Sequence, residues 1–594
     1  MNVTWNPATR RWLFGVVCVV AAVWLTSRGL GDETFVSTHG DPPRYMMNAM
    51  FMLDLLRDHP FGSLDELREY STLYYARYPA LSLGHHPPFI SMAQVPFLAI
   101  LGPSITVVRL PIILMFAAGV LCLHLLVTDL FDEWSGGAAG LVMAASPSLV
   151  YETQAVLSDS VAAALTVVAA YCLHRYLATE RRAMLVGFVL AAVCAVLAKP
   201  NAVVAYPAFL AYATARLGWR RLLQRDFLVA GAAIGLLAGG FVGATIAVSD
   251  FNVGRSTQMI RLALFRKPAP TPTASAAPAS APASARATVP AAAPPPLPPP
   301  PVRLGPTLMR VAAFTPHALA VQLSAVTAFI AVGGLLFLVG ARGPAAWLFG
   351  VWAVTAYVFV ALFTQRVEME RYGAYWLPSL AAGVGWLTLL ARQRSARGVV
   401  AAAVVTIALL FEVSAGAAVR VHGLSGYEEA ARYVQEHPRG TTVMFSGDFD
   451  TGYFVFFTRK HDPGRRAIVL RSDKIFTVSS MRRLALVDLI DSPASIAPTF
   501  ARLGTGYIVI EDQKSQSPVL EWVRQELHSD RYIERLRVPI DTRDLRLQHT
   551  DIVVYEPTHV SDPAPDARLD LRLPLVSKQF DVPLADLIAR KHLP

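Results

Sequence analysis

The sequence predicts a polytopic α-helical membrane domain followed by a soluble C-terminal α/β domain. Of the 594 residues, 54% are hydrophobic and 16% are charged, and the mean hydropathy is +0.42. Apolar stretches of helical length recur up to about residue 419, long enough to cross a bilayer core of about 30 Å. After Arg420 the composition becomes that of an ordinary soluble protein.

Eleven apolar stretches predict about eleven transmembrane helices in residues 1–419. The expected spans are 12–26, 107–128, 137–152, 157–177, 183–198, 201–216, 226–248, 318–340, 346–363, 375–391 and 398–418. The apolar stretch 89–104 contains Pro96 and Pro103 and follows a polar loop, so we expect a re-entrant or interfacial helix there. The four cysteines are isolated inside expected helices and form no metal or disulfide pattern.

The distribution of charge predicts the topology. The net charge of +10 comes largely from arginines in short loops between apolar stretches, as the positive-inside rule expects of cytoplasmic loops, and this disfavours nucleic acid as a partner. With a cytoplasmic N-terminus, alternation places loop 28–88 and everything after residue 419 on the extracytoplasmic side of the cell (inner) membrane. The acidic loop 129–136 is the exception to this pattern.

Two further regions have a distinct composition. Residues 267–302 are almost entirely Pro, Ala, Ser and Thr, which predicts a disordered external linker because such a segment buries no core. Residues 420–594 predict an extracytoplasmic α/β domain, with helices at 427–436, 495–503 and 518–528 and strands at 442–446, 467–470, 507–511 and 552–555. Gly504-Thr505-Gly506 leads from a helix into a strand, so we interpret it as a turn and not as a phosphate loop.

Loop 28–88 carries the first candidate site residues. Asp32 and Glu33 directly follow the first helix, and an ionisable pair at that depth is costly to desolvate. One carboxylate can act as a general base while the other orients substrate or helps to hold a metal. The alternative is a pair that only solvates the helix exit.

His85 and His86 close the same loop, directly before Pro87 and Pro88, whose fixed φ directs the histidine. The alternative is a helix start with proline in the first turn. Asp159 lies at the start of an apolar helix, where it either caps the helix or contributes to a site. Lys199 lies at a Lys-Pro break between two helices, where a lone lysine can simply extend to the interface.

A late external loop adds Arg366, Arg371 and Tyr372. Arginine at an external helix end is the opposite of what the positive-inside rule favours, so these arginines are candidates for phosphate binding. The same alternation of spans places all the candidate residues on one side of the membrane. Ionisable groups of both signs at that depth are expected to find each other.

Taken in order, these motifs resemble those of the GT-C glycosyltransferases over about residues 1–420. The shared features are Asp32-Glu33, His86-Pro87-Pro88-Phe89, Val108-Arg109-Leu110-Pro111, Ala145-Ser146-Pro147, Leu157-Ser158-Asp159, Leu197-Ala198-Lys199-Pro200, and Arg371-Tyr372 with Leu377-Pro378. The chain looks most like the group that uses polyprenyl-phosphate sugars, which comprises protein O-mannosyltransferases, aminoarabinose transferases and bacterial core-sugar transferases.

The resemblance implies an inverting sugar transfer from a polyprenyl-phosphate donor to a lipid, glycan or protein hydroxyl outside the membrane. It implies Asp32 as the general base, with Glu33 as the second choice. Lys199, Arg366 and Arg371 would stabilise the leaving phosphate, and His86 would lie near the phosphate or sugar. Thr34-Phe35-Val36 departs from the family, whose members often carry a tyrosine there, and the proline-rich insertion is not a family feature.

Other functions remain open at this point. A transporter or lipid flippase would also use ionisable residues in the membrane, but it is expected to show broken helices in two related halves, and no internal repeat is visible. A non-catalytic assembly protein would leave the acidic pair and the external arginines unexplained. No cofactor is certain, although Glu33 and the histidines could ligate a divalent ion.

Overall fold

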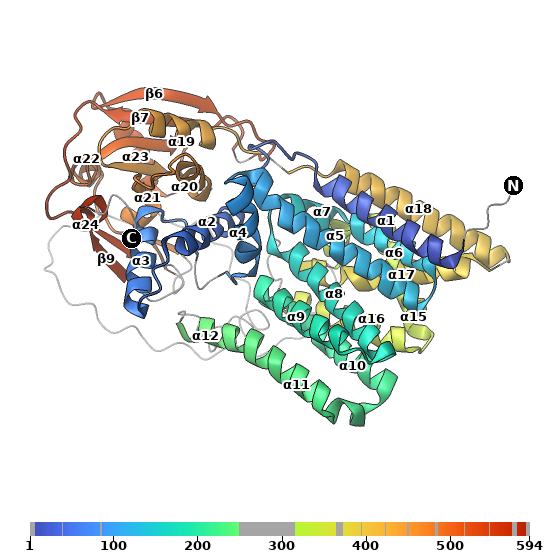
Figure 1. The fold of residues 1–594 in the computed structure, drawn as a ribbon. Coiled ribbons are helices and arrows are strands. Elements are labelled where there is room, and N and C mark those ends of the chain that lie inside the picture. The colour runs from blue at the N-terminus through green and yellow to red at the C-terminus, as the bar shows by residue number, and fades with distance from the viewer. Residues whose placement is uncertain are drawn as a thin grey trace, which may run out of the picture.

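The computed structural model describes residues 6–37, 40–82, 86–248, 315–363, 372–393, 395–421, 423–447, 451–480, 485–515, 517–545, 547–572 and 579–589. Figure 1 shows a bundle of long helices with a smaller sheet-containing domain beside one of its ends. The proline-rich segment 267–302 lies outside the described residues, so its predicted disorder stays a prediction.

Every one of the eleven apolar stretches is helical over most of its described length. Their helices are α1 (Pro7–Thr26), α5 (Ile105–Leu130), α6 (Glu133–Ala145), α8 (Ser158–Thr179), α9 (Arg182–Ala198), α10 (Tyr206–Leu217), α11 (Arg225–Ile234) with α12 (Gly240–Val248), α15 (Ala325–Gly340), α16 (Pro344–Phe363), α17 (Leu377–Ala391) and α18 (Ala396–Ala418). Among the described residues, five helices are long and apolar enough to cross a membrane, or six if one bent pair is a single span.

Several expected spans are interrupted instead of continuous. Ser146 separates α6 from α7 (Pro147–Gln154), where Pro147 begins the new helix. The stretch from residue 201 opens with a 3₁₀ segment, η1 (Pro200–Ala205), because Pro200 cannot continue α9. A π-helical segment, η3 (Gly235–Gly239), joins α11 to α12, and helix Thr315–Gln322 meets α15 at a bend of 107°. The number of spans therefore stays a prediction.

The first loop contains two helices that the sequence analysis did not expect. They are α2 (Pro42–Asp58) and α3 (Leu64–Arg77), and they pack beside the C-terminal domain at the end of the bundle (Figure 1). Their buried faces are rich in tyrosine and methionine, including Tyr45, Met50 and Tyr74. The next helix, α4 (Phe89–Leu101), has 13 residues and contains Pro96, which fits the expected short interfacial or re-entrant helix.

Ion pairs join the short loops at the end of the bundle away from the C-terminal domain. Arg10 and Arg11 of α1 pair with Glu133 and Asp129, each at 2.7 Å. Asp132 pairs with Arg392 at the end of α17. These contacts explain the acidic loop 129–136, because its carboxylates are neutralised by arginines of the same face.

The C-terminal domain is built on a mixed five-stranded sheet with the strand order β2-β1-β5-β7-β6. The strands are β1 (Thr442–Ser446), β2 (Val469–Arg471), β5 (Thr505–Glu511), β6 (Tyr532–Pro539) and β7 (Asp551–Pro557); β1 is parallel to β2 and β5, and β7 is antiparallel to β5 and β6. Strands β3 (Thr477–Ser480) and β4 (Ala485–Asp488), and β8 (Arg568–Arg572) and β9 (Gln579–Pro583), form two small hairpins.

The expected helices of this domain are confirmed as α19 (Tyr427–Glu436), α22 (Ile496–Arg502) and α23 (Pro518–Leu527), while α20 (Thr451–Lys460), α21 (Ser472–Ile475) and α24 (Leu584–Ala589) were not predicted. Gly504 has a φ of +61°, which suits glycine at the turn into β5. The described turn therefore agrees with the interpretation of Gly504-Thr505-Gly506.

Buried ion pairs fasten the C-terminal domain to the first loop. Arg459 of α20 donates to both carboxylate oxygens of Asp54 in α2 at 2.8 Å, and the two side chains are 5% and 1% exposed. Tyr74 donates to the same carboxylate at 2.8 Å, and Arg465 pairs with Asp58 one turn further along α2. Removing one partner of such a buried pair typically costs about 3–5 kcal/mol, because the remaining charge is left uncompensated.

Candidate functional site

Asp32 and Glu33 lie in the turn that follows α1. Arg109 of α5 fixes this turn by donating to the carbonyl oxygens of Thr26, Arg28 and Gly29 at 2.7–3.0 Å. Asp32 is exposed, and its carboxylate accepts hydrogen bonds from the backbone N–H and the hydroxyl of Thr34 at 2.9 and 2.6 Å. This closes a local turn of a kind that aspartate commonly forms.

Glu33 has a different set of partners. Its carboxylate accepts from the backbone N–H of Ile105 at 2.9 Å and of Thr106 at 3.4 Å, the first two residues of α5. It also pairs with Lys460 of the C-terminal domain at 2.9 Å. A carboxylate at a helix N-terminus satisfies free N–H groups and the positive end of the helix dipole. Glu33 therefore has a clear structural role in this arrangement.

A second acidic residue of the first loop lies beside His86. Oδ1 of Asp41 is 3.6 Å from Nε2 of His86 and 3.7 Å from the guanidinium of Arg44. The ring of Tyr45 meets the His86 ring edge-on, with the centroids 4.8 Å apart. We call Asp41, Arg44, Tyr45 and His86 the His86 group. The His86 and Asp41 side chains are 9% and 21% exposed.

The local sequence explains why Asp41 faces His86. Asp41 is the N-cap of α2, a position where aspartate usually accepts from the backbone N–H groups of the first turn. Pro42 and Pro43 remove the first two of these donors, and no side-chain hydrogen bond caps the helix. The carboxylate is thus turned toward the histidine and not toward its own helix.

The predicted residues Asp159, Lys199 and Tyr372 form a third set of contacts. Lys199 makes a partly buried ion pair with Asp159 in the first turn of α8, where the N-cap is Leu157 and not Asp159. Its ammonium group also lies 4.9 Å from the centre of the Tyr372 ring, a cation–π contact. Pro200 restricts Lys199 to an extended conformation, φ −156° and ψ 125°, which ends α9.

Tyr45 connects this pair to the His86 group. Its hydroxyl donates to Oγ of Ser158, the residue directly before Asp159, at 2.9 Å. The turn before Ser158 is strained, because Val156 is a buried β-branched residue with φ +60°. The structure therefore brings His86, Asp159, Lys199 and Tyr372 to one end of the bundle, together with Asp41, Arg44 and Tyr45.

The remaining predicted residues are not part of this arrangement. Among the described residues, no hydrogen bond or ion pair joins Asp32 or Glu33 to the His86 group or to Lys199. His85, Arg366 and Arg371 lie outside the described residues. The part of the chain that is described holds no group of three or more potential metal ligands among His, Cys, Asp and Glu, so a divalent ion stays a prediction.

The C-terminal domain adds a basic residue near Arg44 that the sequence analysis missed. Burial, with the positive charges of Arg471 and Arg44, lowers the pKa of Lys474 in α21 to about 7, although Asp473 opposes this shift. The Lys474 ammonium donates to the hydroxyl of Tyr75 in α3. No motif marks Lys474, because it reaches Arg44 only through the docking of the two domains.

Asp41 had a detectable signal in the sequence. Asp41-Pro42-Pro43 repeats the pattern of His86-Pro87-Pro88, in that each places an ionisable residue directly before two prolines and a helix. In the structure the ionisable residues of the two motifs, Asp41 and His86, lie side by side.

Comparisons with known proteins agree with this architecture. Residues 85–239 match the family described as dolichyl-phosphate-mannose-protein mannosyltransferase. No curated protein matches the chain. The crystal structure of ArnT from Cupriavidus metallidurans in the apo state is similar to this chain, with a TM-score of 0.52 and 12% identity over 94% of this chain and 100% of that one.

Two further solved structures are similar to the same extent. ArnT from Cupriavidus metallidurans bound to undecaprenyl phosphate has a TM-score of 0.53 and 13% identity, and the match covers 93% of this chain and 99% of that one. The apo oligosaccharyltransferase from Archaeoglobus fulgidus has a TM-score of 0.51 and 10% identity, covering 91% and 76%. The chain thus has the GT-C glycosyltransferase fold that its ordered motifs predicted.

Proposed function

We propose that the protein is an integral-membrane glycosyltransferase. It transfers a sugar from a polyprenyl-phosphate donor to a hydroxyl group of a lipid, glycan or protein, with inversion at the anomeric carbon. One observation carries the proposal: a carboxylate beside a histidine and a lysine paired with a buried aspartate lie at the same end of the helical domain, linked by Tyr45 and Ser158. The matched family and the undecaprenyl phosphate in the similar ArnT structure support this choice of donor.

The proposed general base is a carboxylate of the first loop. Asp41 suits this role better than Asp32, because it lies against His86 in a partly enclosed position, whereas Asp32 is exposed and closes a local turn. A base must come within hydrogen-bonding reach of the hydroxyl that it deprotonates. The positions of His86 and Arg44 beside Asp41 favour a polar group of the acceptor or donor there.

The proposed phosphate side is formed by Lys199, with Arg366 and Arg371 as further candidates. Lys199 lies at a helix break, and its ammonium is held between Asp159 and the ring of Tyr372. A fixed cation at this position stabilises the charge that develops on the departing phosphate. Arg366 and Arg371 keep this role as a prediction, because they belong to the sequence segment that leads into Tyr372.

The proposed sugar transfer is a single displacement that uses Asp41 as the base and Lys199 beside the leaving phosphate. The acceptor oxygen attacks the anomeric carbon from the face opposite the phosphate and forms the new glycosidic bond. Its proton passes to the Asp41 carboxylate as the bond between the anomeric carbon and the phosphate oxygen breaks. The electron pair of that bond stays on polyprenyl phosphate, whose negative charge meets Lys199. One such displacement inverts the anomeric configuration.

The direct test uses the purified full-length protein, a polyprenyl-phosphate sugar and a mixture of envelope acceptors. We expect release of polyprenyl phosphate that depends on the acceptor, and a product with inverted anomeric configuration by NMR. A flippase would move the donor across a vesicle bilayer without releasing lipid phosphate. Such movement without release, or a product that retains configuration, would contradict the proposal.

The proposed location is the cell membrane, with the C-terminal domain on the extracytoplasmic side. Glu436 at the end of α19 is exposed, and the four native cysteines lie in the membrane helices α1, α5, α8 and α9. Glu436→Cys should therefore be labelled by a membrane-impermeant maleimide in intact spheroplasts. Labelling only after lysis would place this domain in the cytoplasm.

A further inference from the structure

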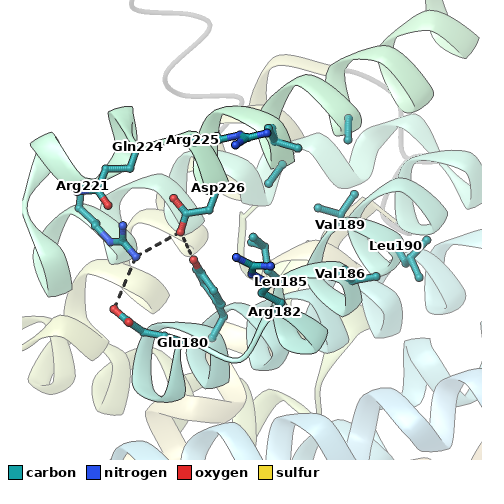
Figure 2. Close-up of a pocket in the computed structure, with 14 residues that line it drawn as sticks. Glu180, Arg182, Leu185, Val186, Val189, Leu190, Arg221, Gln224, Arg225 and Asp226 are labelled. Atoms are coloured by element: carbon teal, nitrogen blue, oxygen red, sulfur yellow. Dashed lines mark hydrogen bonds and ion pairs between the residues drawn. The ribbon is translucent and has the colours of Figure 1, made fainter.

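A groove of about 910 Å³ lies between α9 and α11, at the ends of these helices away from the His86 group. Figure 2 shows charged side chains at one end of the groove and aliphatic side chains along the rest. The charged end contains Glu180, Arg182, Arg221, Arg225 and Asp226. None of these residues belongs to the proposed catalytic site.

The charged end keeps a positive balance after its internal pairs are formed. Arg221 lies 3.6 Å from Glu180 and 3.3 Å from Asp226, as the dashed lines in Figure 2 show. Arg182 and Arg225 form no ion pair with any residue that the structure describes. Three arginines against two carboxylates leave one net positive charge (3 − 2 = +1). Two guanidinium groups are thus left to bind an anion, and phosphate oxygens suit their geometry.

Two helix N-termini reinforce this charge. Arg182 and Arg225 are the first residues of α9 and α11, and neither helix has a side-chain hydrogen bond at its N-cap. The first N–H groups of a helix and its dipole both favour an anion at this end. At α11 the carboxylate of Asp226 already accepts from the backbone N–H of Phe227, so the start of α9 reinforces the arginines more than the start of α11 does.

The rest of the groove is apolar. Leu185, Val186, Val189 and Leu190 line it from α9, and Val229 and Ala233 line it from α11. Leu190 lies eight positions after Arg182, and Ala233 lies eight positions after Arg225. At 1.5 Å per residue, the apolar surface extends to about 12 Å from each arginine. A soluble phosphate compound would leave this surface unused.

The surroundings place the charged end at the level of lipid headgroups. The 3₁₀ segment η2 (Trp219–Leu223) leads into α11, and Trp219 is 61% exposed. Exposed tryptophan beside arginine is typical of the membrane interface. Val186, Leu190 and Val229 are also more than half exposed, and only 11% of the apolar window of α11–α12 is buried, against 67% for α5. The groove is thus open to the bilayer along its side.

We propose that this groove is a binding site for an anionic phospholipid of the leaflet opposite the catalytic site. Arg182 and Arg225 bind the phosphodiester, and an acyl chain lies along the aliphatic side chains of α9 and α11. Basic pockets between membrane helices are known to select anionic headgroups in this way. A zwitterionic lipid carries an ammonium group that the neighbouring arginines disfavour.

The test measures lipid binding by the full-length protein in detergent, without an activity assay. We expect native mass spectrometry to retain one phosphatidylglycerol molecule per chain, and its affinity to exceed that of phosphatidylcholine with the same acyl chains by about tenfold or more. Arg182→Gln with Arg225→Gln should abolish this preference. Arg181→Gln with Arg220→Gln is the matched control, because it removes equal charge from the same two loops outside the groove, and it should keep the preference.

A second variant guards against misfolding of the double mutant. Ala233→Trp fills the apolar part of the groove without changing its charge, and it should weaken phosphatidylglycerol binding while leaving the thermal unfolding of lipid-free protein unchanged. Equal binding of the two lipids by the wild type, or an unchanged preference in the Arg182/Arg225 variant, would overturn the proposal. Displacement of phosphatidylglycerol from this groove by equimolar undecaprenyl phosphate would also overturn it, because the groove would then belong to the lipid carrier.

Discussion

Two acidic stretches of the first loop differ sharply in what they contact. Asp32 accepts from the backbone N–H and the hydroxyl of Thr34, two residues away. Glu33 accepts from backbone N–H groups at the start of α5 and pairs with Lys460. Asp41 stands nine positions after Asp32 and contacts the side chains of His86 and Arg44. Acidic residues after a helix can serve only to stabilise the fold. An acidic residue before two prolines cannot accept hydrogen bonds from the N–H groups that those prolines lack.

The physical cause of the difference is the supply of backbone donors. The N-terminus of α5 offers free N–H groups, and Glu33 accepts from two of them. The N-terminus of α2 offers fewer, because its first two residues are Pro42 and Pro43. Where the backbone supplies fewer donors, the carboxylate of the N-cap residue turns toward side chains, as Asp41 does toward His86 and Arg44.

The strongest test of this comparison exchanges one carboxylate at a time. Asp41→Asn should lower the rate of polyprenyl-phosphate release by about 10²–10⁴-fold, because the amide cannot accept the acceptor proton. Asp32→Asn should stay close to the wild-type rate, since the carboxylate accepts its hydrogen bonds from Thr34, within its own turn. The measurement is single-turnover release from the purified proteins, each matched for its melting temperature.

The opposite result would reverse the comparison. Full activity of Asp41→Asn together with a collapse in Asp32→Asn would restore Asp32 as the base, as its position in the family motif predicts. The same loss in both variants would point to damage of the loop and not to either assignment.

The next effect concerns the phosphate side of the site. Lys199→Gln should lower the rate of transfer by about 10²–10³-fold, as expected when one fixed cation is removed from a developing charge. If Lys199 acts on the leaving group, kcat falls more than KM rises. A change confined to KM would instead mean that Lys199 only binds the donor.

A smaller effect is expected on stability. Glu33→Ala removes an acceptor for the first two N–H groups of α5, whose N-cap Ser104 remains, and it removes the pair with Lys460. Together these losses should lower the free energy of unfolding by about 1 kcal/mol. The rate of transfer per folded molecule should remain that of the wild type. Thermal unfolding in detergent, with activity normalised to folded protein, separates the two readouts, and lost activity at unchanged stability would argue for a catalytic Glu33.

The smallest expected effect is on the pH dependence of the melting temperature. Burial raises the pKa of Glu428, but hydrogen bonds from His461 and Lys460 outweigh it and lower this pKa to about 2. Because the folded pKa lies below the ordinary value of about 4.3, the stabilisation is present above that value and is lost as the pH falls toward 2. The melting temperature of the wild type should therefore fall more steeply between pH 5 and 3 than that of Glu428→Gln. Parallel curves would show that the network with Lys460 contributes nothing.

The sequence was informative where one physical cause dominates. Apolar length predicted the membrane helices, and short apolar runs predicted strands such as Thr442–Ser446. The order of the motifs predicted the fold and identified Asp159, Lys199 and His86 as candidate site residues. Strand β6 was missed because it lies at the edge of the sheet and its side chains are largely exposed, so it shows no buried apolar run.

The rest depended on contacts between distant parts of the chain. Helices α2 and α3 have low mean apolar character, and they are buried because they pack against distant parts of the chain: α2 against α4 and α20, and α3 against β9 and α24. Asp41 was overlooked because it belongs to this polar stretch and its partner His86 is 45 positions away. Lys474 meets Tyr75 and the charge of Arg44 only because the C-terminal domain docks against the first loop.

The Asp54–Arg459 ion pair has a consequence for how such a protein can be altered. Asp54 lies on α2, whose N-cap is Asp41, so the C-terminal domain anchors the helix next to the proposed base. A chimaera that exchanges residues 420–594 alone would leave Asp54 buried without its guanidinium. The transferable module is therefore discontinuous: the first loop and the C-terminal domain have to be exchanged together, and they are expected to have co-varied as one unit during divergence.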